Sequence, residues 1–311
     1  MLLQANNIIK EYAAHRALND VSIAIDSGNI FGLLGPNGAG KTSLIRIINQ
    51  ITAPDAGEIW FDGEKLNPKH IAQIGYLPEE RGLYKKMKVG EQALYLAQLK
   101  GMEKSEANKK LKFWFEKFDI DGWWNKKVEE LSKGMAQKVQ FITTVLHEPK
   151  LLILDEPFSG FDPINANLIK DEILQLASNG TTVVLSTHNM ESVEAICTHI
   201  ALINQSKKVL GGAVKQIQKD FSKNTYTLDY TGAPIALANT MWANNTLLSN
   251  NTIDKNNHLQ RAVIKLDDDV SLNQFLGQIL PDIKLVGVQE LIPSMNDIFI
   301  EVVNQNKDSH E

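Results

Sequence analysis

The sequence predicts an α/β fold followed by a small C-terminal α+β domain, and three features of the chain indicate this. Short β-branched and apolar runs alternate with amphipathic stretches over the first two thirds, which is typical of a sheet covered by helices. A long stretch rich in Leu, Ala, Glu and Lys, from Val89 to Ile120, indicates a helical insert. The texture changes after Gly211 and Gly212. We therefore expect a first domain over 1–212, with a helical subdomain at about 86–140, and a second domain over 213–311.

Three short apolar runs are the predicted strands of the first domain. They are Ile30–Leu34, Leu151–Leu154 and Thr182–Leu185. Each is too short for a helix and is bounded by polar residues or glycine, so a buried strand is the better interpretation.

The C-terminal third contains its own set of predicted elements. A short helical linker covers Ala213–Lys223, and the stretch Asn239–Asn257 is rich in asparagine, which favours a loop. The predicted strands are Tyr226–Tyr230, Arg261–Leu266 and Lys284–Gln289, and the predicted helices are Leu272–Leu280 and Met295–Val303.

Composition excludes several classes of protein. The 311 residues are 43% apolar and 22% charged with a net charge of -5, so there is no basic footprint and no nucleic-acid partner is expected. The single cysteine, Cys197, excludes an internal disulfide, and its apolar helical surroundings predict a buried, inert thiol. Neither a signal peptide over Met1–Lys10 nor an apolar run of about 20 residues is present. We expect a cytoplasmic protein that reaches the membrane through partners.

The run Gly35–Thr42 matches the phosphate-loop pattern G-x-x-x-x-G-K-[ST] and lies between a predicted strand and a predicted helix. Glycines let the backbone wrap around phosphate oxygens, and the helix N-terminus favours their negative charge. We expect Lys41 to reach the β- and γ-phosphates and the Thr42 hydroxyl to ligate Mg²⁺. The residues expected to hold the nucleoside triphosphate are Gly35, Pro36, Asn37, Gly38, Ala39, Gly40, Lys41, Thr42 and Ser43.

Two acids, Asp155 and Glu156, end the apolar run that begins at Leu151. Consecutive side chains on a strand point to opposite faces, so we expect the two carboxylates to have different roles. Asp155 is placed to support Mg²⁺, and Glu156 is then free to accept a proton from the attacking water as a general base.

The run Leu131–Lys138 resembles the signature motif, usually written L-S-G-G-Q, of the ABC ATPases. Further elements in the same order are similar to that family: Ser159–Asp162 to the D-loop, Ser186–His188 to the switch histidine, and Tyr12 to the aromatic residue that stacks on adenine. The resemblance covers about Leu2 to Gly212.

The resemblance implies a head-to-tail dimer that encloses two ATP molecules. Each nucleotide is then held by the phosphate loop of one copy and by the signature segment of the other, for which the matching positions are Ser132, Lys133, Gly134 and Met135, together with Asp162 of the D-loop. His188 is expected to contact the γ-phosphate. ATP is preferred over GTP because the N-K-x-D motif that reads guanine is absent from the sequence.

Some positions depart from the family pattern. Glu79 stands where the glutamine of the Q-loop is usual, and we expect it to take the place of that residue at Mg²⁺ and the reaction centre, with Arg81 offsetting its charge. Lys133 and Met135 replace Gly and Gln of the signature. The segment Glu79–Tyr84 is expected to lie in the groove that receives a cytoplasmic helix of a membrane partner.

The combination of Pro78–Tyr84, Leu131–Met135 and Pro293–Ile300 is similar to the ATPase subunits of bacterial ABC-2-type exporters linked to sodium extrusion and drug efflux, which carry a small C-terminal accessory domain. This resemblance implies ATP hydrolysis coupled to export at the cytoplasmic face of the membrane. It also implies integral membrane permease subunits as partners, with a homodimer of ATPase domains or a heterodimer with a paralogue. A dimerisation or spacer role is expected for the accessory domain, and a ligand-binding regulator is the other possibility.

A soluble ABC ATPase acting on nucleic acid or ribosomes is the alternative. Such proteins typically have two ATPase domains, a long coiled coil or zinc-binding cysteines. One phosphate loop, one cysteine and no sustained heptads argue against it.

Overall fold

The computed structural model describes residues 1–13, 15–80, 82–232, 237, 245–254, 257–267 and 269–308. Arg81, expected to offset the charge of Glu79, lies outside these residues. The chain divides into two compact units, Met1–Val214 with Val302–Glu311, and Lys215–Glu301.

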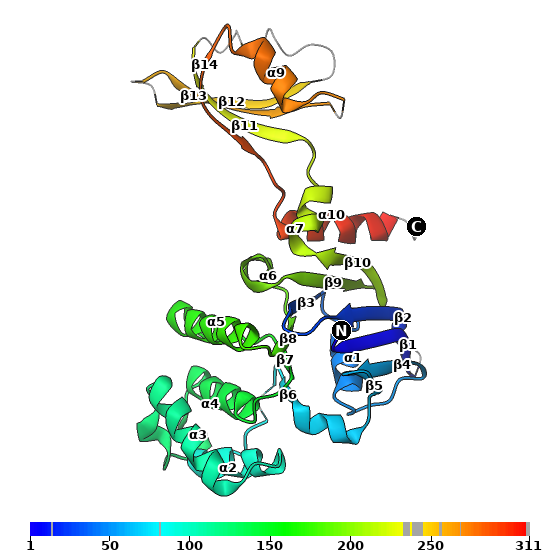
Figure 1. Ribbon diagram of the computed structural model, residues 1–311, viewed down its shortest axis with the longest axis vertical. Coiled ribbons are helices and arrows are strands. Elements are labelled where there is room, and N and C mark those ends of the chain that lie inside the picture. Colours follow the sequence, from blue (N-terminus) through cyan, green and yellow to red (C-terminus); the bar gives the residue numbers. More distant parts are fainter. Residues whose placement is uncertain are drawn as a thin grey trace. The chain divides into compact units, whose positions relative to one another are not determined.

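The first unit contains two sheets and a group of helices (Figure 1). Its elements are β1 (Leu3–Tyr12), β2 (His15–Ile25), β3 (Ile30–Leu34), α1 (Lys41–Ile48), β4 (Ala56–Phe61), β5 (Glu64–Lys65), β6 (Ile74–Leu77), α2 (Val89–Leu99), α3 (Lys104–Lys117), α4 (Lys133–Val145), β7 (Leu151–Asp155), α5 (Pro163–Ser178), β8 (Thr182–Ser186), α6 (Met190–Ile196), β9 (His199–Asn204) and β10 (Lys207–Ala213).

The central sheet has the order β10-β9-β3-β8-β7-β6, and only β10 runs antiparallel to its neighbour. Strands β3, β7 and β8 are buried along their whole length, because helices cover parallel sheets on both faces. The three strands predicted from short apolar runs are therefore confirmed, and so is the α/β fold class. The carboxyl ends of β3, β7 and β8 consequently meet at one edge of the sheet.

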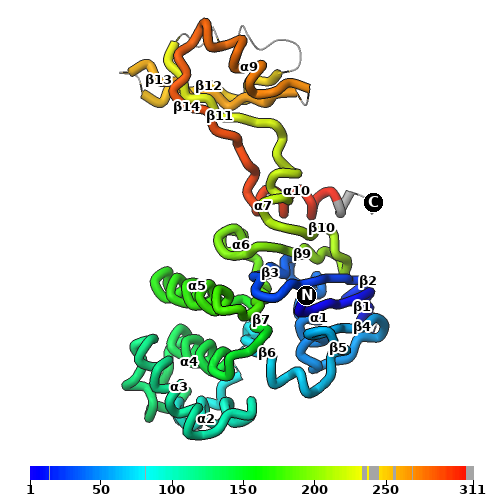
Figure 2. The backbone as a smooth tube through the Cα atoms, in the orientation of Figure 1, coloured from blue at the N-terminus to red at the C-terminus, as the bar shows by residue number. Residues whose placement is uncertain are grey.

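A second sheet, β2-β1-β4-β5, is antiparallel and was not predicted from the sequence. Strands β2, β1, β4 and β5 lie side by side in Figure 2. The pairing of β1 with β2 shifts register three times between Ala5 and Glu11, and Asn7 has a φ of 51°. These irregularities interrupt the apolar–polar alternation that identifies a half-buried strand.

The predicted helical stretch Val89–Ile120 forms two helices, α2 and α3, rather than one. The break follows Lys100, where Gly101 has a φ of 88°, which is the left-handed conformation that commonly ends a helix. Helix α3 buries Ala107, Leu111 and Phe115, spaced four residues apart on one face. Helix α2 packs against α3 and α4 (Figure 1).

The second unit is built on one antiparallel sheet with the order β12-β13-β11-β14, which is the strand order of a split β-α-β fold. Its elements are β11 (Thr225–Thr231), β12 (Thr246–Asp254), β13 (Leu259–Lys265), α9 (Leu272–Ile279) and β14 (Lys284–Glu290), together with most of α7 (Val214–Asp220) and the first half of α10 (Met295–Asp308). Its core consists of Leu228, Tyr230, Leu237, Ala262, Ile264, Leu266, Phe275, Ile279 and Ile283.

The loop predicted over Asn239–Asn257 is wrong for its described second half, because Thr246–Asp254 forms strand β12. Strand β12 lies at the sheet edge and pairs only with β13 among the described strands, so polar side chains are tolerated along it. Asn250 donates from Nδ2 to the Tyr230 hydroxyl at 2.7 Å, which gives one of the asparagines a partner next to the core. The remaining predicted strands and helices of this unit are confirmed.

The prediction that Cys197 is buried is confirmed, and burial raises the pKa of its thiol to about 12. Among the residues that the structure describes, none of the helices combines the length and the apolarity needed to cross a bilayer.

Candidate nucleotide-binding site

The candidate site lies at the edge of the central sheet where β3, β7 and β8 end. The glycine-rich loop follows β3, Asp155 and Glu156 follow from β7, and Thr187 and His188 follow β8. Because β3 pairs with β8 and β8 pairs with β7, all in parallel, three segments far apart in the chain reach the same place.

A cavity of about 430 Å³, which we call the loop cavity, opens at this edge. It brings together most of the residues predicted to bind nucleotide or metal or to act in catalysis. Its lining is formed by Tyr12, His15, Ala17, Asn37, Gly38, Gly40, Lys41, Thr42, Ser43, Glu79, Asp155, Glu156 and His188.

Two glycines lie where the glycine-rich loop passes close to the backbone of neighbouring strands. Gly40 has a φ of 116°, and a Cβ there would meet the carbonyl oxygen of Ala17. Gly35 has a φ of 146°, and a Cβ there would meet the carbonyl oxygen of Ile203. Both conformations favour glycine, so these positions keep the loop against β2 and β9 while its other side faces the cavity.

Lys41 is the first residue of α1 and is almost fully buried. Its Nζ donates to the carbonyl oxygens of Gly35 and Pro36, at 2.7 and 3.1 Å. These two loop residues, with Ala39, are the predicted phosphate-loop positions that do not line the cavity. The ammonium group is therefore already folded into the loop.

The electrostatics of the loop cavity are unbalanced. Burial lowers the pKa of Lys41, while the nearby carboxylates of Glu156, Asp155 and Glu79 oppose that shift. Burial raises the pKa of Asp155, and the charges of Glu79 and Glu156 raise it further. Three carboxylates thus share one cavity with a single lysine ammonium. A bound cation of higher charge would balance this excess of negative charge.

Glu156 and His188 are in direct contact. The Glu156 carboxylate accepts from the Thr187 hydroxyl at 3.0 Å and from the His188 backbone N–H at 2.9 Å, and its Oε1 lies 2.6 Å from His188 Nδ1. The imidazole is mostly exposed, whereas the carboxylate is mostly buried. His188, expected to meet a γ-phosphate, is thus oriented here by the candidate general base.

The alternation argument for the two acids holds only in part. Strand β7 ends at Asp155, and Glu156 has a φ of 48°, so the chain has already left the extended conformation. Both side chains consequently line the same cavity. Their surroundings still differ, because Asp155 is more deeply buried and Glu156 is held by Thr187 and His188.

The chemistry of these donors fits Mg²⁺ bound together with a triphosphate. Magnesium in such sites takes one or two protein carboxylates and fills its shell with phosphate oxygens and water. The loop cavity offers Asp155, Glu79 and the exposed hydroxyl of Thr42. Within the described chain, no three acidic, histidine or cysteine side chains form a self-contained metal site. A metal here would need ligands from the nucleotide.

The signature and D-loop residues lie outside the loop cavity. Ser132 is the N-cap of α4, and its hydroxyl accepts from the backbone N–H of Met135 at 3.3 Å. Asp162 is the N-cap of α5 and accepts from the backbone N–H groups of Ile164 and Asn165, both at 3.0 Å. The hydrogen bonds from Asn165 and Ile164 lower the pKa of Asp162. Neither these residues nor Lys133 and Gly134 line the loop cavity.

Three residues that sequence patterns did not identify also lie at the site. His15 and Ala17 line the cavity, and Thr187 donates to Glu156. His15 is paired with Tyr12 across the first hairpin, and the ammonium of Lys10 lies 5.4 Å from the Tyr12 ring. The pairing of His15 with Tyr12 is what places His15 at the site. The irregularities of β1 make that pairing hard to predict from the sequence.

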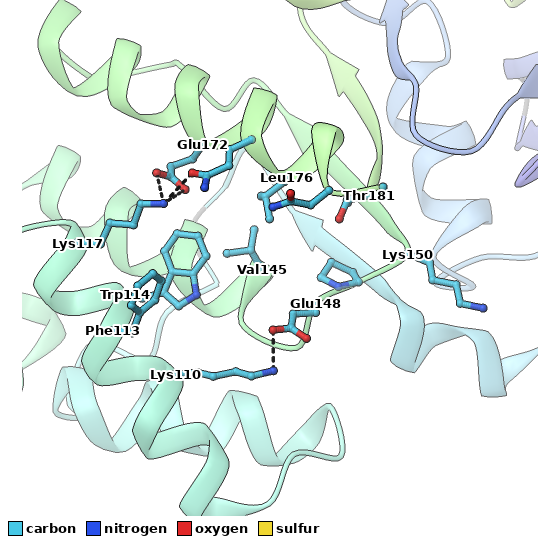
Figure 3. A pocket seen from close by; sticks show the side chains of 14 residues that line it. Lys110, Phe113, Trp114, Lys117, Val145, Glu148, Lys150, Glu172, Leu176 and Thr181 are labelled. Carbon is cyan, nitrogen blue, oxygen red and sulfur yellow. Dashed lines mark hydrogen bonds and ion pairs between the residues drawn. The ribbon is translucent and has the colours of Figure 1, made fainter.

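A larger cavity, of about 590 Å³, lies between α3, α5 and the segment after α4 (Figure 3). We call it the Trp114 cavity. Each of its five charged lining residues is already in an ion pair: Lys110 with Glu148, Lys117 with Glu172, and Lys150 with Asp62. Size alone therefore does not make it a competing ligand site.

Comparisons with known proteins agree with this geometry. Residues 18–159 match the family described as ABC transporter, and residues 212–303 match the C-terminal domain described as ATP-binding protein DrrA1-3-like. The uncharacterized ABC transporter ATP-binding protein YhaQ of Bacillus subtilis (strain 168) is 46% identical over 73% of this chain and 76% of its own length. The lipopolysaccharide export system ATP-binding protein LptB of Escherichia coli (strain K12) is 32% identical over 70% and 93%.

A solved structure is similar as well. The structure described as the ATP binding subunit of an ABC transporter superposes with a TM-score of 0.67 at 28% identity, over 71% of this chain and 93% of that one. Sequence, fold and the arrangement of the loop cavity lead to the same conclusion. The chain belongs to the ATP-binding subunits of the ABC transporter family.

Proposed function

We propose that this chain hydrolyses Mg·ATP in a site shared between two ATPase domains and thereby drives transport through separate permease subunits. The observation that carries the proposal is the separation of two groups of residues on one chain. The loop cavity holds Lys41, Asp155 and Glu156, while Ser132 and Gly134 lie outside it at the start of α4.

The phosphate loop supplies the binding of the triphosphate. Its backbone N–H groups and the start of α1 favour negative charge, and the Lys41 ammonium exchanges the carbonyls of Gly35 and Pro36 for phosphate oxygens. Thr42, Asp155 and Glu79 would hold Mg²⁺, which when bound neutralises charge on the phosphates.

Glu156 is the proposed general base. Its contacts with the Thr187 hydroxyl and the His188 backbone orient the carboxylate without consuming all of its lone pairs. His188 would shift from Glu156 Oε1 toward the γ-phosphate and keep water and phosphate aligned. Tyr12, which lines the cavity with its hairpin partner His15, would stack on the adenine ring.

The second half of the site comes from another ATPase domain, either a copy of this chain or a paralogue. The capped start of α4, a helix of thirteen residues, presents backbone N–H groups suited to an anion. Ser132, Lys133, Gly134 and Met135 would meet the γ-phosphate held by the other domain, with Asp162 shaping the adjacent D-loop. ATP then bridges the two domains, and its hydrolysis weakens the bridge.

A groove of about 490 Å³ is the proposed docking site for a permease helix. It is lined by Pro78, Gly82 and Leu83, by Leu96, Leu99 and Lys100 of α2, and by polar residues of α4. Leu99 is 65% exposed beside it, and the nearby Tyr84 and Tyr95 rings are exposed and in contact. Exposed apolar side chains around a groove are typical of a surface that receives an amphipathic helix.

Export is the proposed direction of transport, at the cytoplasmic face of the bacterial membrane. It is supported by the DrrA1-3-like C-terminal domain and by the likeness to an ATP-binding protein of a lipopolysaccharide export system. A dimerisation or spacer role is proposed for residues 213–311.

Co-purification of the chain with a polytopic membrane protein supports the proposed transport function, and co-purification with ribosomes or DNA contradicts it.

The direct test of hydrolysis is Glu156→Gln. The turnover of ATP should fall by about two to four orders of magnitude, which is the usual contribution of a general base, while ATP binding is retained. Glu191→Gln, which removes an exposed carboxylate from the start of α6, is the matched control and should keep wild-type turnover. Near-normal turnover in Glu156→Gln removes Glu156 from the mechanism.

A further inference from the structure

A second, smaller cavity of about 250 Å³ lies next to the loop cavity, and we call it the Lys133 cavity. Its lining comes from the end of β6, the start of α4 and the D-loop: Leu77, Pro78, Glu79, Glu80, Lys133, Gln137, Gln140 and Ser159. Glu79 lines both cavities. Its side chain therefore borders both the loop cavity of the chain and the cavity at the start of α4, the helix that follows the signature segment.

The Lys133 side chain lies against the D-loop of the same chain. Gly160 has a φ of 84°, and a Cβ added there would lie 2.8 Å from Lys133 Nζ and closer still to Cε. The missing side chain at Gly160 thus makes room for the lysine. Lys133 is exposed and lines the same cavity as Glu79 and Glu80.

The polar groups around this cavity are short of donors. Gln137 donates from Nε2 to the Pro157 carbonyl at 2.9 Å, but its Oε1 is buried without a hydrogen-bond partner in the described part of the chain. Glu79 and Glu80 add two carboxylates. Among the described residues of the lining, Lys133 is the one with a cationic side chain, and its three donor hydrogens make it suited to these acceptors.

Glu79 and Lys133 are also the two positions where opposite charges replace the uncharged residues usual in the family, glutamine and glycine. A carboxylate at position 79 adds negative charge beside the phosphates, as its influence on Lys41 and Asp155 shows. A lysine at position 133, which lines the second cavity together with Glu79, adds a positive charge.

Building on the proposed function, we propose that Glu79 and Lys133 form a charge couple across the Lys133 cavity. Lys133 acts as a positioning residue: it neutralises Glu79 so that a carboxylate is tolerated beside the phosphates of the chain's own nucleotide. Glu79 has a second possible partner in the cation at its own site, and when it turns there Lys133 is released at the start of α4. Binding of the cation at the chain's own site thereby changes the contacts of Lys133, which lies in the segment proposed to face the other ATPase domain.

The test is a double-mutant cycle on nucleotide affinity rather than on turnover. Fluorescent mant-ADP is titrated without Mg²⁺ into the full chain, its Lys133→Gln and Glu79→Gln variants, and the double variant. Lys133→Gln should weaken binding about three- to tenfold when Glu79 is present and less than about twofold when Glu79 is replaced, given the strength of partly exposed ion pairs. Lys133→Arg keeps the charge and should bind as the wild type does.

Lys138→Gln is the matched control, because it removes the same charge from α4 at a residue that lines neither cavity. It should change mant-ADP affinity equally little in both backgrounds. Equal effects of Lys133→Gln with and without Glu79, or an effect of Lys138→Gln as large, overturn the charge couple. Failure of the wild-type chain to bind mant-ADP would instead overturn the proposed function, so the two failures are distinct.

Discussion

The ion pair between Lys117 and Glu172 joins helix α3 to helix α5, and Lys117→Met tests its contribution to stability. Lys117 lies on α3 and Glu172 on α5, and their side chains meet at one end of the Trp114 cavity (Figure 3). Their Nζ and Oε1 atoms are 2.7 Å apart, and Lys117 also donates to Gln175 at 3.0 Å. The Glu172 side chain is 6% exposed and that of Lys117 28% exposed.

The magnitude follows from this difference in burial. Removing one partner of a fully buried pair costs about 3–5 kcal/mol, since an uncompensated charge remains inside the protein. Lys117 is partly exposed, so water can reach the carboxylate after the substitution, and we expect a loss of about 2–3 kcal/mol. For a unit of this size, that corresponds to a melting temperature lower by roughly 4–12 °C.

The assay is urea and thermal unfolding of the full chain, followed by the fluorescence of its five tryptophans, one of which, Trp114, has its ring centroid 5.3 Å from Lys117 Nζ. Lys110→Met is the matched control from the same cavity: its partner Glu148 is 75% exposed, so the loss should stay below about 1 kcal/mol. Adding Glu172→Gln to Lys117→Met should recover at least half of the stability. Equal losses in Lys117→Met and Lys110→Met would refute the reasoning.

Two further substitutions test the loop cavity. Gly40→Ala places a Cβ against the Ala17 carbonyl at a φ of 116°. The free energy of unfolding should therefore fall by about 1–3 kcal/mol, and the affinity for mant-ATP should fall at least tenfold. Unchanged binding of mant-ATP would contradict the loop geometry. For Asp155, burial raises the folded pKa, so the stability linked to this group is complete below the ordinary value of 3.8 and is lost as the pH rises through the folded pKa. Without nucleotide, Asp155→Asn should therefore have a melting temperature about 1–3 °C above that of the wild type at pH 7, and no such increase at acid pH. The variant should also lose the stabilisation that Mg·ATP gives the wild type. A melting temperature below that of the wild type at pH 7 would contradict this reasoning.

Local patterns were sufficient to predict the glycine-rich loop between β3 and α1, the two acids at the end of β7 and the fold class. Each of these depends on a few consecutive residues with a strong conformational preference, such as the glycines before Lys41 or the apolar run before Asp155. The confirmed strands of the parallel sheet are short and apolar because both of their faces are covered.

What could not be predicted depends on contacts between distant segments. His15 reaches the cavity through its pairing with Tyr12, and Thr187 reaches Glu156 because β7 and β8 are neighbours. Strand β12 is stabilised by pairing with β13, which overrides the loop preference of its asparagines. The positive φ of Glu156, which turns both acids into one cavity, is likewise imposed by the surrounding structure.

The central claim is that a complete catalytic site needs two chains, and mixing two inactive variants tests it most directly. Lys41→Ala lacks a working phosphate loop, and Ser132→Arg lacks a working signature segment, so each alone should be inactive. In a mixed dimer, the loop of the Ser132→Arg chain meets the intact α4 of the Lys41→Ala chain. An equimolar mixture should regain about a quarter of wild-type turnover, since half of randomly formed dimers are mixed and each has one intact site of two. Turnover by the wild-type chain alone establishes that its active partner is a second copy. Given that turnover, no regained activity in the mixture, or full activity of Ser132→Arg alone, would contradict the shared site.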